Sequence, residues 1–457
     1  MLYNTIKMLN RKIISRLEQW AASATRKPLI LRGARQVGKT VAVNMFGKQF
    51  DHFIPLNLDL PPESEIFKRS LPINDLFQAI LLKKGISSTG GKTLLFLDEV
   101  QNSPEAVASL RYFYEKLPHI YVVAAGSLLE IITGKKQIPI PVGRVEYAFM
   151  YPLSFREFLV VSGGGPAIEA FDSVPLPEFA LPALFELFHR YTLIGGMPEI
   201  VARYMEENDV AGLGPVYNSL LTSYLDDVEK YARNPTMANI LRHCIESAPF
   251  EAGKRIKFAG FGNSNYRSRE VGEALRALER AQLIRLLNPS TAVEIPIRPD
   301  MKKSPRLQFL DTGLVNYFVG LQEQYFKHED LSAIYRGLIT EHITGQELIC
   351  SQPNTLKKQC FWVREKTQSN AEVDFLIQHG EYAIPVETKA GKAGRLRSLH
   401  QFIDRSPHKY AVRLYYGPVL LQKTKTPAGK PYQLLNLPYF LASKVHEYLD
   451  WMLSDEL

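Results

Sequence analysis

The chain has 457 residues, a length that predicts two to four domains rather than a single core. Hydrophobic residues make up 46% of the sequence and charged residues 22%, a balance that excludes a disordered or fibrous protein. The formal net charge of +8 is compatible with a polyanionic partner such as nucleic acid, but it does not require one.

The cysteines Cys244, Cys350 and Cys360 lie far apart and form no Cys-x-x-Cys pair. This pattern predicts neither a disulfide framework nor a zinc site, and a reducing, cytoplasmic location is the simplest expectation. Residues 1–12 carry polar residues throughout and lack the apolar core of a signal peptide. Because no uninterrupted apolar run reaches about eighteen residues, we expect no membrane span.

The first motif with chemical meaning follows the short apolar run at 28–32. Gly33, Ala34, Arg35, Gln36, Val37, Gly38, Lys39 and Thr40 fit the pattern G-x-x-x-x-G-K-S/T, and residues 41–46 can continue as a helix. This order of strand, loop and helix turns backbone N–H groups toward phosphate oxygens. Lys39 is then expected to reach the β- and γ-phosphates of ATP, and the Thr40 hydroxyl to bind Mg²⁺. The alternative is a chance match in a glycine-containing turn.

Two carboxylates end a second apolar run. Residues 94–97 are typical of a strand buried in a parallel sheet, and Asp98 and Glu99 follow them directly. Asp98 is expected to hold the Mg²⁺ shell, and Glu99 to polarise the attacking water. The pair is weak evidence by itself, but together with the loop it indicates ATP hydrolysis.

Ser127 and Arg144 are further candidates. Ser127 follows the apolar run at 120–125, and we expect it either to sense the γ-phosphate or to cap the next helix. Arg144 is expected either to stabilise transferred charge, in its own subunit or across a subunit interface, or to form a structural ion pair. The predicted nucleotide contacts are therefore Gly33, Ala34, Arg35, Gln36, Val37, Gly38, Lys39, Thr40, Val41, Asp98 and Ser127.

These motifs resemble a family of bacterial and archaeal AAA+ ATPases that carry a C-terminal nuclease-like domain of unassigned function. The resembling segments are 33–40, 96–101, 125–130, 141–146 and 151–158, and with the later motifs they cover nearly the whole chain. The resemblance implies an α/β P-loop AAA+ core with a parallel sheet at 1–165 and a helical lid at 166–236. It implies ATP and Mg²⁺ as cofactors, and a homo-oligomer is the assembly in which Arg144 would reach a neighbouring site.

A winged-helix domain is predicted at 237–325. Val271, Leu275, Leu278 and Gln282 recur near helical spacing and form one buried stripe, which indicates the second helix of a helix-turn-helix. A wing strand is expected at 284–287. Such a helix can enter a DNA major groove, but its outward face also carries glutamates that would repel phosphates. A structural or protein-docking role is therefore favoured. Lys254, Arg255, Lys257, Arg267 and residues 298–306 form a candidate basic patch, for which a solvated loop is the alternative.

The domain expected at 326–457 contains two strands joined by a tight turn at 378–381. Strand geometry puts Glu387 and Lys389 on one face, and pairing of the strands would bring Asp374 near Glu387. Two carboxylates and an ammonium are the groups with which a hydrolytic nuclease binds Mg²⁺ and activates water. The alternative is a solvated hairpin with ordinary charges.

This arrangement resembles the PD-(D/E)XK restriction-endonuclease-like fold. The resemblance implies that Glu341, on a preceding helix, completes a metal site with Asp374 and Glu387. The leading hypothesis is thus a Mg²⁺-dependent ATPase coupled to binding or processing of DNA or RNA. The alternative is a regulatory ATPase that acts on protein partners and whose C-terminal domain is an inactive scaffold.

Overall fold

The computed structural model describes residues 11–86, 90–126, 141, 143–162, 164–322, 338–351, 358–366, 369–391 and 395–454. They divide into two compact units. Unit 1 comprises residues 1–151 with 280–283, and unit 2 comprises residues 152–279 and 284–457. No helix among the described residues is both long and apolar enough to cross a membrane.

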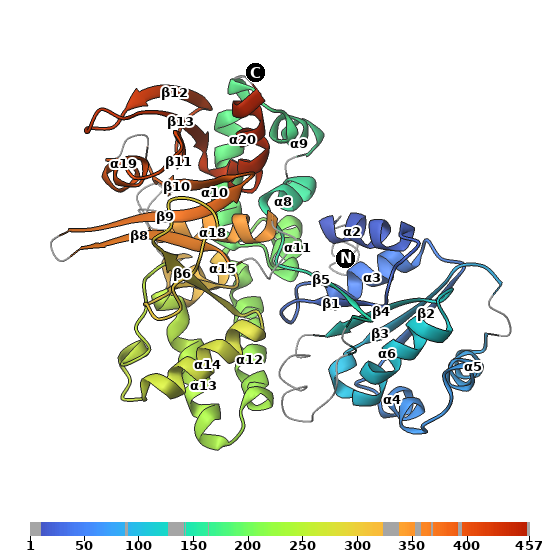
Figure 1. The fold of residues 1–457 in the computed structure, drawn as a ribbon. Coiled ribbons are helices and arrows are strands. Elements are labelled where there is room, and N and C mark those ends of the chain that lie inside the picture. Colours follow the sequence, from blue (N-terminus) through green and yellow to red (C-terminus); the bar gives the residue numbers. More distant parts are fainter. Residues whose placement is uncertain are drawn as a thin grey trace. The chain divides into compact units, whose positions relative to one another are not determined.

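Unit 1 is built on a five-stranded sheet in the order β2-β3-β4-β1-β5, and all its pairings are parallel. The strands are β1 (Leu29–Arg32), β2 (His52–Asn57), β3 (Thr93–Asp98), β4 (Tyr121–Gly126) and β5 (Glu146–Phe149). The helices are α2 (Lys12–Ala22), α3 (Lys39–Gly47), α4 (Pro61–Lys68), α5 (Ile73–Lys84) and α6 (Pro104–Lys116), with the short η1 (Val100–Asn102). Figure 1 shows α2 and α3 on one face of the sheet and α4, α5 and α6 on the other.

Burial on both faces explains why the strands of unit 1 are apolar runs rather than alternating ones. Residues 94–97 of β3 are at most 1% exposed, and β4 is buried from Val122 onward. A parallel strand covered by helices on both sides requires this composition. The carboxyl ends of β1, β3 and β4 meet at one edge because the strands are parallel and neighbouring, so Gly33 and Asp98 follow strands at the same edge.

Unit 2 contains an eight-stranded mixed sheet in the order β12-β13-β11-β10-β9-β8-β6-β7. Its strands are β6 (Ile284–Ser290), β7 (Arg306–Phe309), β8 (Cys360–Lys366), β9 (Ser369–His379), β10 (Tyr382–Thr388), β11 (Tyr410–Tyr415), β12 (Leu420–Lys425) and β13 (Pro431–Pro438). The wing strand expected at 284–287 lies in β6. It pairs with β7 on one side and with β8 on the other, so the sheet continues across the boundary expected near 325.

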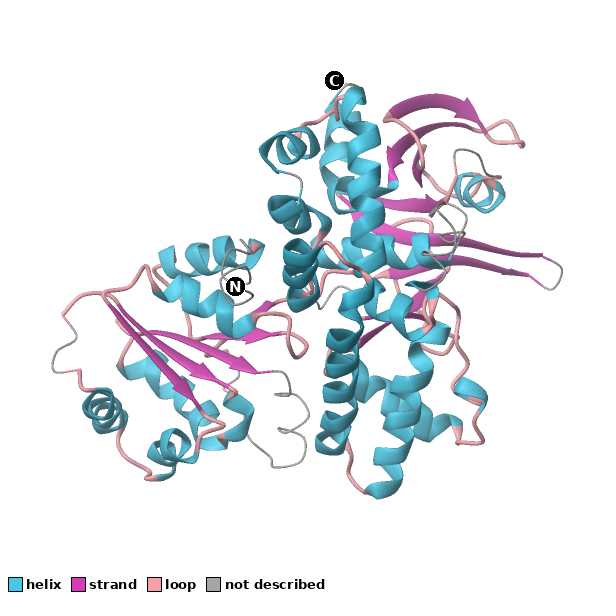
Figure 2. Ribbon diagram, turned by 180° about the vertical axis from the view of Figure 1, so that it is seen from behind, coloured by secondary structure: helices cyan, strands magenta, loops and turns pink. Residues whose placement is uncertain are grey.

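Unit 2 also contains the helices that Figure 2 shows around this sheet and in a separate group at one end of the unit. They are α8 (Phe155–Ser162), α9 (Gly164–Asp172), α10 (Leu181–Ile194), α11 (Pro198–Glu207), α12 (Gly214–Tyr231), α13 (Pro235–Ser247), α14 (Ser268–Arg280), α15 (Thr312–Phe318), α18 (Leu338–Ser351), α19 (Arg397–Ile403) and α20 (Val445–Ser454). Short 3-10 helices are η2 (Glu178–Ala180), η3 (Ala211–Leu213), η4 (Ala248–Glu251), η5 (Phe261–Asn263) and η6 (Tyr439–Lys444).

The helices expected to form a lid belong to unit 2 and not to the unit of the phosphate-binding loop. A buried polar contact ties them to the C-terminal part. Glu347 of α18 accepts hydrogen bonds from the Tyr191 hydroxyl of α10, at 2.8 Å, and from the backbone N–H of Phe155, at 3.0 Å. Phe155 also packs against Phe188 and Phe440. The family resemblance implies helices here, but it does not reveal which core they join.

Candidate nucleotide site and carboxylate cluster

The loop from Gly33 to Thr40 has the backbone geometry that a phosphate-binding loop needs. A Cβ at Gly33 would lie 2.4 Å from the carbonyl oxygen of Met150, so only glycine fits there. Gly38 has φ 94°, in the left-handed region that favours glycine, and α3 begins immediately after it. The N–H of Ala42 donates to the carbonyl oxygen of Gly38 at 3.0 Å and begins the helical hydrogen-bond pattern. The N–H groups before it, at the helix N-terminus, are of the kind that can donate to an anion.

Lys39 is held inside this loop. Its Nζ donates to the carbonyl oxygens of Gly33, at 3.0 Å, and Ala34, at 2.8 Å, and the residue is 8% exposed. Burial lowers the pKa of the ammonium to about 8, although nearby Glu99 and Asp98 oppose this effect. Charged phosphate oxygens would be stronger acceptors than these carbonyls. The predicted contact of Lys39 with phosphate therefore fits its environment.

The Thr40 hydroxyl and the Asp98 carboxylate are in direct contact. The hydroxyl donates to Oδ2 of Asp98 at 2.7 Å, across the gap between α3 and β3. Burial raises the pKa of Asp98, because a carboxylate that is removed from water lacks solvation. A cation at these two oxygens would restore favourable interactions, so the donor set fits a hard divalent ion such as Mg²⁺.

Glu99 has a strained backbone and a positioned side chain. Its φ of 50° and ψ of 42° lie in the left-handed region, which a non-glycine residue adopts only at a cost of about 1–3 kcal/mol. Its carboxylate accepts a short hydrogen bond from the side-chain amide of Gln101. Strain of this kind clusters at functional sites. Gln101 had no role in the sequence analysis, because its contact depends on the turn of η1.

Arg11 fixes the loop from the side, and no sequence motif marks it. Its guanidinium is buried and donates to the carbonyl oxygens of Val37, at 2.9 Å, and Tyr151, at 2.6 Å. It thereby joins the phosphate-binding loop to the segment that follows β5. Only the folded arrangement brings these residues, distant in sequence, together.

Arg144 and Ser127 are the two remaining candidate residues in unit 1, and only Arg144 lies among the described residues. The Nε of Arg144 donates to Oε1 of Glu115 on α6 at 3.0 Å, which is the structural ion pair weighed in the sequence analysis. Its catalytic role stays a prediction. Ser127 lies outside the described residues.

In unit 2, β9 and β10 bring the predicted carboxylates together. The strands pair antiparallel with Phe375 opposite Val386, which places Asp374 beside Glu387 at the end of the ladder. Oδ2 of Asp374 accepts a hydrogen bond from the Thr388 N–H at 2.7 Å, and Nζ of Lys389 donates to Oε1 of Glu387 at 2.6 Å. Asp374 is 8% exposed and Glu387 is 5% exposed.

Arg306 of β7 lies within this cluster, although its place in the sequence indicates only the end of the basic stretch 298–306. Its Nη1 is 3.4 Å from Oε2 of Glu341, and its Nη2 is 3.8 Å from Oδ1 of Asp374. The guanidinium also donates to the carboxylate of Glu372 on β9. The side chain is only 7% exposed, so Arg306 is a buried cation bound by three carboxylates.

Burial and mutual repulsion raise the pKa values of two carboxyl groups in the cluster. Burial, reinforced by repulsion from Asp374, raises the pKa of Glu387 to about 8. Burial and the same neighbour raise the pKa of Glu341 to about 7. Across the described ranges no three His, Cys, Asp or Glu side chains are arranged to hold a metal ion. Arg306 contacts Glu341 and Asp374 and supplies a positive charge where a metal ion would supply one, and the role of these carboxylates as metal ligands stays a prediction.

Three family models match successive parts of the chain. Residues 25–159 match a family described as AAA domain. Residues 185–325 and 336–437 match two families described as domains of unknown function, DUF8612 and DUF4143. No curated protein matches the sequence.

Solved structures with similar folds have low identity. A Walker-type ATPase of Pyrococcus abyssi is 17% identical to this chain, with a TM-score of 0.42. The match covers 68% of this chain and 96% of the ATPase chain. The ORC2 protein of Aeropyrum pernix, in ADPNP-ADP complexes, is 12% identical, covering 69% and 94%, with a TM-score of 0.33. The RuvB Holliday junction branch migration motor of Thermotoga maritima is 15% identical, covering 64% and 93%, with a TM-score of 0.27. At these scores the likenesses carry no argument about this chain. Residues 25–159 are therefore similar to an AAA domain, and their loop at 33–40 has glycines where a phosphate-binding loop requires them.

Proposed function

We propose that the protein is a Mg²⁺-dependent ATPase whose nucleotide cycle is coupled to nucleic acid through unit 2. The observation that carries the ATPase part is the contact between Thr40 and Asp98 beside the buried Lys39. The coupling to DNA or RNA is supported by the net charge of +8 and by the resemblance of the C-terminal motifs to PD-(D/E)XK nucleases. The winged helix, with α14 as its second helix and β6 as its wing, belongs to the same proposal.

Each residue of the loop has a defined task in this proposal. The backbone N–H groups at the start of α3, from Lys39 to Val41, bind phosphate oxygens. Lys39 exchanges its two carbonyl acceptors for charged phosphate oxygens. Mg²⁺, when bound by Thr40 and Asp98, would neutralise phosphate charge. Glu99 orients the attacking water and accepts its proton.

Nucleic acid is expected to accelerate ATP hydrolysis, and added salt is expected to weaken that acceleration, because phosphate contacts release counterions on binding. The measurement is steady-state phosphate release by the full chain with single-stranded DNA, double-stranded DNA or RNA at two salt concentrations. Turnover that none of these polymers changes would contradict the coupling and would leave the ATPase proposal intact.

The carboxylate cluster supports a second candidate for unit 2, a nuclease-like scaffold that binds without cutting. Arg306 favours it, because a buried guanidinium already neutralises the carboxylates that would hold a metal ion. The competing hypothesis assigns Asp374, Glu387 and Lys389 to metal-dependent cleavage, with Glu341 as a third ligand. In either case a homo-oligomer is the assembly in which Arg144 would serve a neighbouring nucleotide site.

The scaffold predicts that plasmid and short oligonucleotides stay intact with Mg²⁺ or Mn²⁺, with and without ATP. The test compares the wild type with Glu387→Ala by gel electrophoresis, and Glu381→Ala, two residues after the same strand β9, is the control for contaminating nuclease. Metal-dependent cutting that is lost in Glu387→Ala and kept in Glu381→Ala would establish the nuclease and reject the scaffold.

A further inference from the structure

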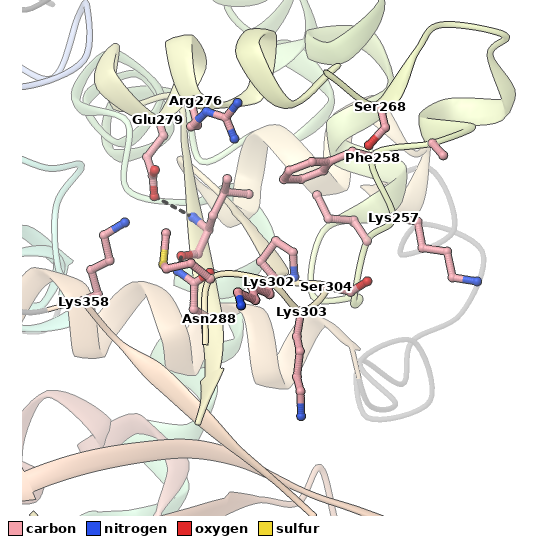
Figure 3. Close-up of a pocket in the computed structure, with 15 residues that line it drawn as sticks. Lys257, Phe258, Ser268, Arg276, Glu279, Asn288, Lys302, Lys303, Ser304 and Lys358 are labelled. Atoms are coloured by element: carbon pink, nitrogen blue, oxygen red, sulfur yellow. Dashed lines mark hydrogen bonds between the residues drawn. The ribbon is translucent and has the colours of Figure 1, made fainter. Parts of the chain in front are cut away.

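A cavity of about 360 Å³ lies within unit 2, beside α14 (Figure 3). Its wall combines α14, β6, residues 256–259, the loop at 301–305 and Lys358. The volume falls in the range of natural ligand pockets, which is about 300–1,000 Å³. The cavity shares no lining residue with the carboxylate cluster, and it lies against α14 and β6 of the proposed winged helix.

The charge of the wall is strongly positive. The basic lining residues are Lys257, Arg276, Lys302, Lys303 and Lys358, and the acidic one is Glu279. Figure 3 shows the Glu279 carboxylate turned to the backbone, where its Oε1 accepts a hydrogen bond from the N–H of Leu286 at 3.0 Å. Lys303 lies 3.9 Å from Asp300.

The other four basic side chains take part in none of the ion pairs found among the described residues. Unpaired positive charges around a concave surface attract and concentrate anions. The chemistry of the wall therefore selects a ligand with several negative charges.

An aromatic ring adds a second kind of contact. Phe258 lines the cavity, half-buried, and packs on α14 so closely that a Cβ at Gly272 would lie 3.0 Å from its ring. Met301, which is 61% exposed, provides another apolar surface at the same wall. Proteins that bind single-stranded nucleic acid combine two kinds of contact. Their basic side chains contact the phosphate backbone, and their aromatic rings stack on bases.

Duplex recognition by α14 fits less well. Glu270 and Glu273 lie on the same helix, and Glu273 already forms an ion pair with Arg233. Carboxylates on a helix in a major groove would face phosphates of like charge. The cavity avoids this conflict, because its single carboxylate is bonded to the backbone.

We propose that this cavity binds a single strand of nucleic acid, with the lysines on its phosphates and Phe258 stacked on a base. The inference rests on the proposed coupling to nucleic acid and gives it a location. Inorganic phosphate shares the anionic chemistry but lacks the base, so it is expected to compete poorly.

The experiment measures fluorescence anisotropy of a labelled oligonucleotide with the full chain over a range of salt. The double variant Lys257→Ala/Lys302→Ala is expected to flatten the plot of log affinity against log salt by about 1.4, since each lost contact with a single strand removes about 0.7. The matched control is Lys423→Ala/Lys425→Ala. These exposed lysines lie on β12, at the opposite end of the same sheet from β6 and β7. The control should keep the wild-type slope.

The ring is tested separately. Phe258→Leu keeps an apolar side chain against α14 but removes the stacking surface, and is expected to weaken binding about fivefold or more, whereas Phe258→Tyr should bind like the wild type. Circular dichroism and the unfolding midpoint verify that each variant is folded.

The outcomes separate this inference from the proposal beneath it. If the lysine double variant binds nucleic acid as tightly as the wild type does, the cavity is rejected as the binding site, but the proposed coupling to nucleic acid is kept. A wild type that binds no DNA or RNA would reject both. Tighter binding of duplex than of single strand, or full displacement by an equal concentration of inorganic phosphate, would reject the single-strand assignment.

Discussion

A Glu99→Gln protein is expected to bind ATP as the wild type does and to hydrolyse it about a hundred- to thousandfold more slowly, the usual effect of removing one well-positioned catalytic group. Gln keeps the size of the side chain and its contact with Gln101, but it cannot accept a proton from water. Lys39 and the Thr40 contact with Asp98 remain in place, so binding should persist.

Binding is measured with a fluorescent ATP analogue and turnover by phosphate release. The matched control is Glu65→Gln, an exposed glutamate on α4 of the same unit, which should turn over normally. Normal turnover of Glu99→Gln would remove Glu99 from its role. Loss of ATP binding would show that its strained turn supports the loop structurally.

Arg306→Ala is expected to destabilise unit 2 by about 3–5 kcal/mol, the usual cost of leaving a buried charge without its partner. The change removes the cation that Glu341, Glu372 and Asp374 share. Denaturant unfolding, followed by tryptophan fluorescence to which the buried Trp362 on β8 contributes, measures the loss. Mn²⁺ should partly restore stability, since the vacated carboxylates then accept a hard cation.

The control for Arg306→Ala is Arg298→Ala, an exposed arginine in the same stretch, for which a change within about 0.5 kcal/mol is expected. A loss below about 1 kcal/mol in Arg306→Ala would contradict the idea that its guanidinium holds the cluster together. A full loss that Mn²⁺ leaves unchanged would mean that Glu341, Asp374 and Glu387 cannot act as metal ligands even without the arginine.

The sequence predicts the local parts of both sites well. The loop at 33–40 lies between a strand and a helix in the structure, and Asp98 ends a buried strand. The hairpin that brings Asp374 beside Glu387 turns where expected, with His379 opposite Tyr382. These features depend on residues within about twenty positions of one another in the sequence, and over that range apolar periodicity and turn residues determine the local structure.

Contacts between distant segments could not be predicted in this way. Arg306 reaches Asp374 across 68 residues, and Arg11 reaches Tyr151 across 140. The extension of the C-terminal sheet through β6 and β7 likewise depends on strand pairing that local patterns do not encode. The segment 166–236 is expected to be a helical lid, but only packing shows that its helices belong to unit 2.

The loop from Gly33 to Thr40 is expected to bind ATP and to support its hydrolysis. The most direct measurement compares Mg²⁺-dependent phosphate release and ATP affinity in the wild type and in Lys39→Ala. We expect the wild type to turn over and the variant to lose both tight binding and turnover, because Lys39 is the buried cation of the loop. Equal ATP affinity and equal turnover in the two proteins would contradict the account.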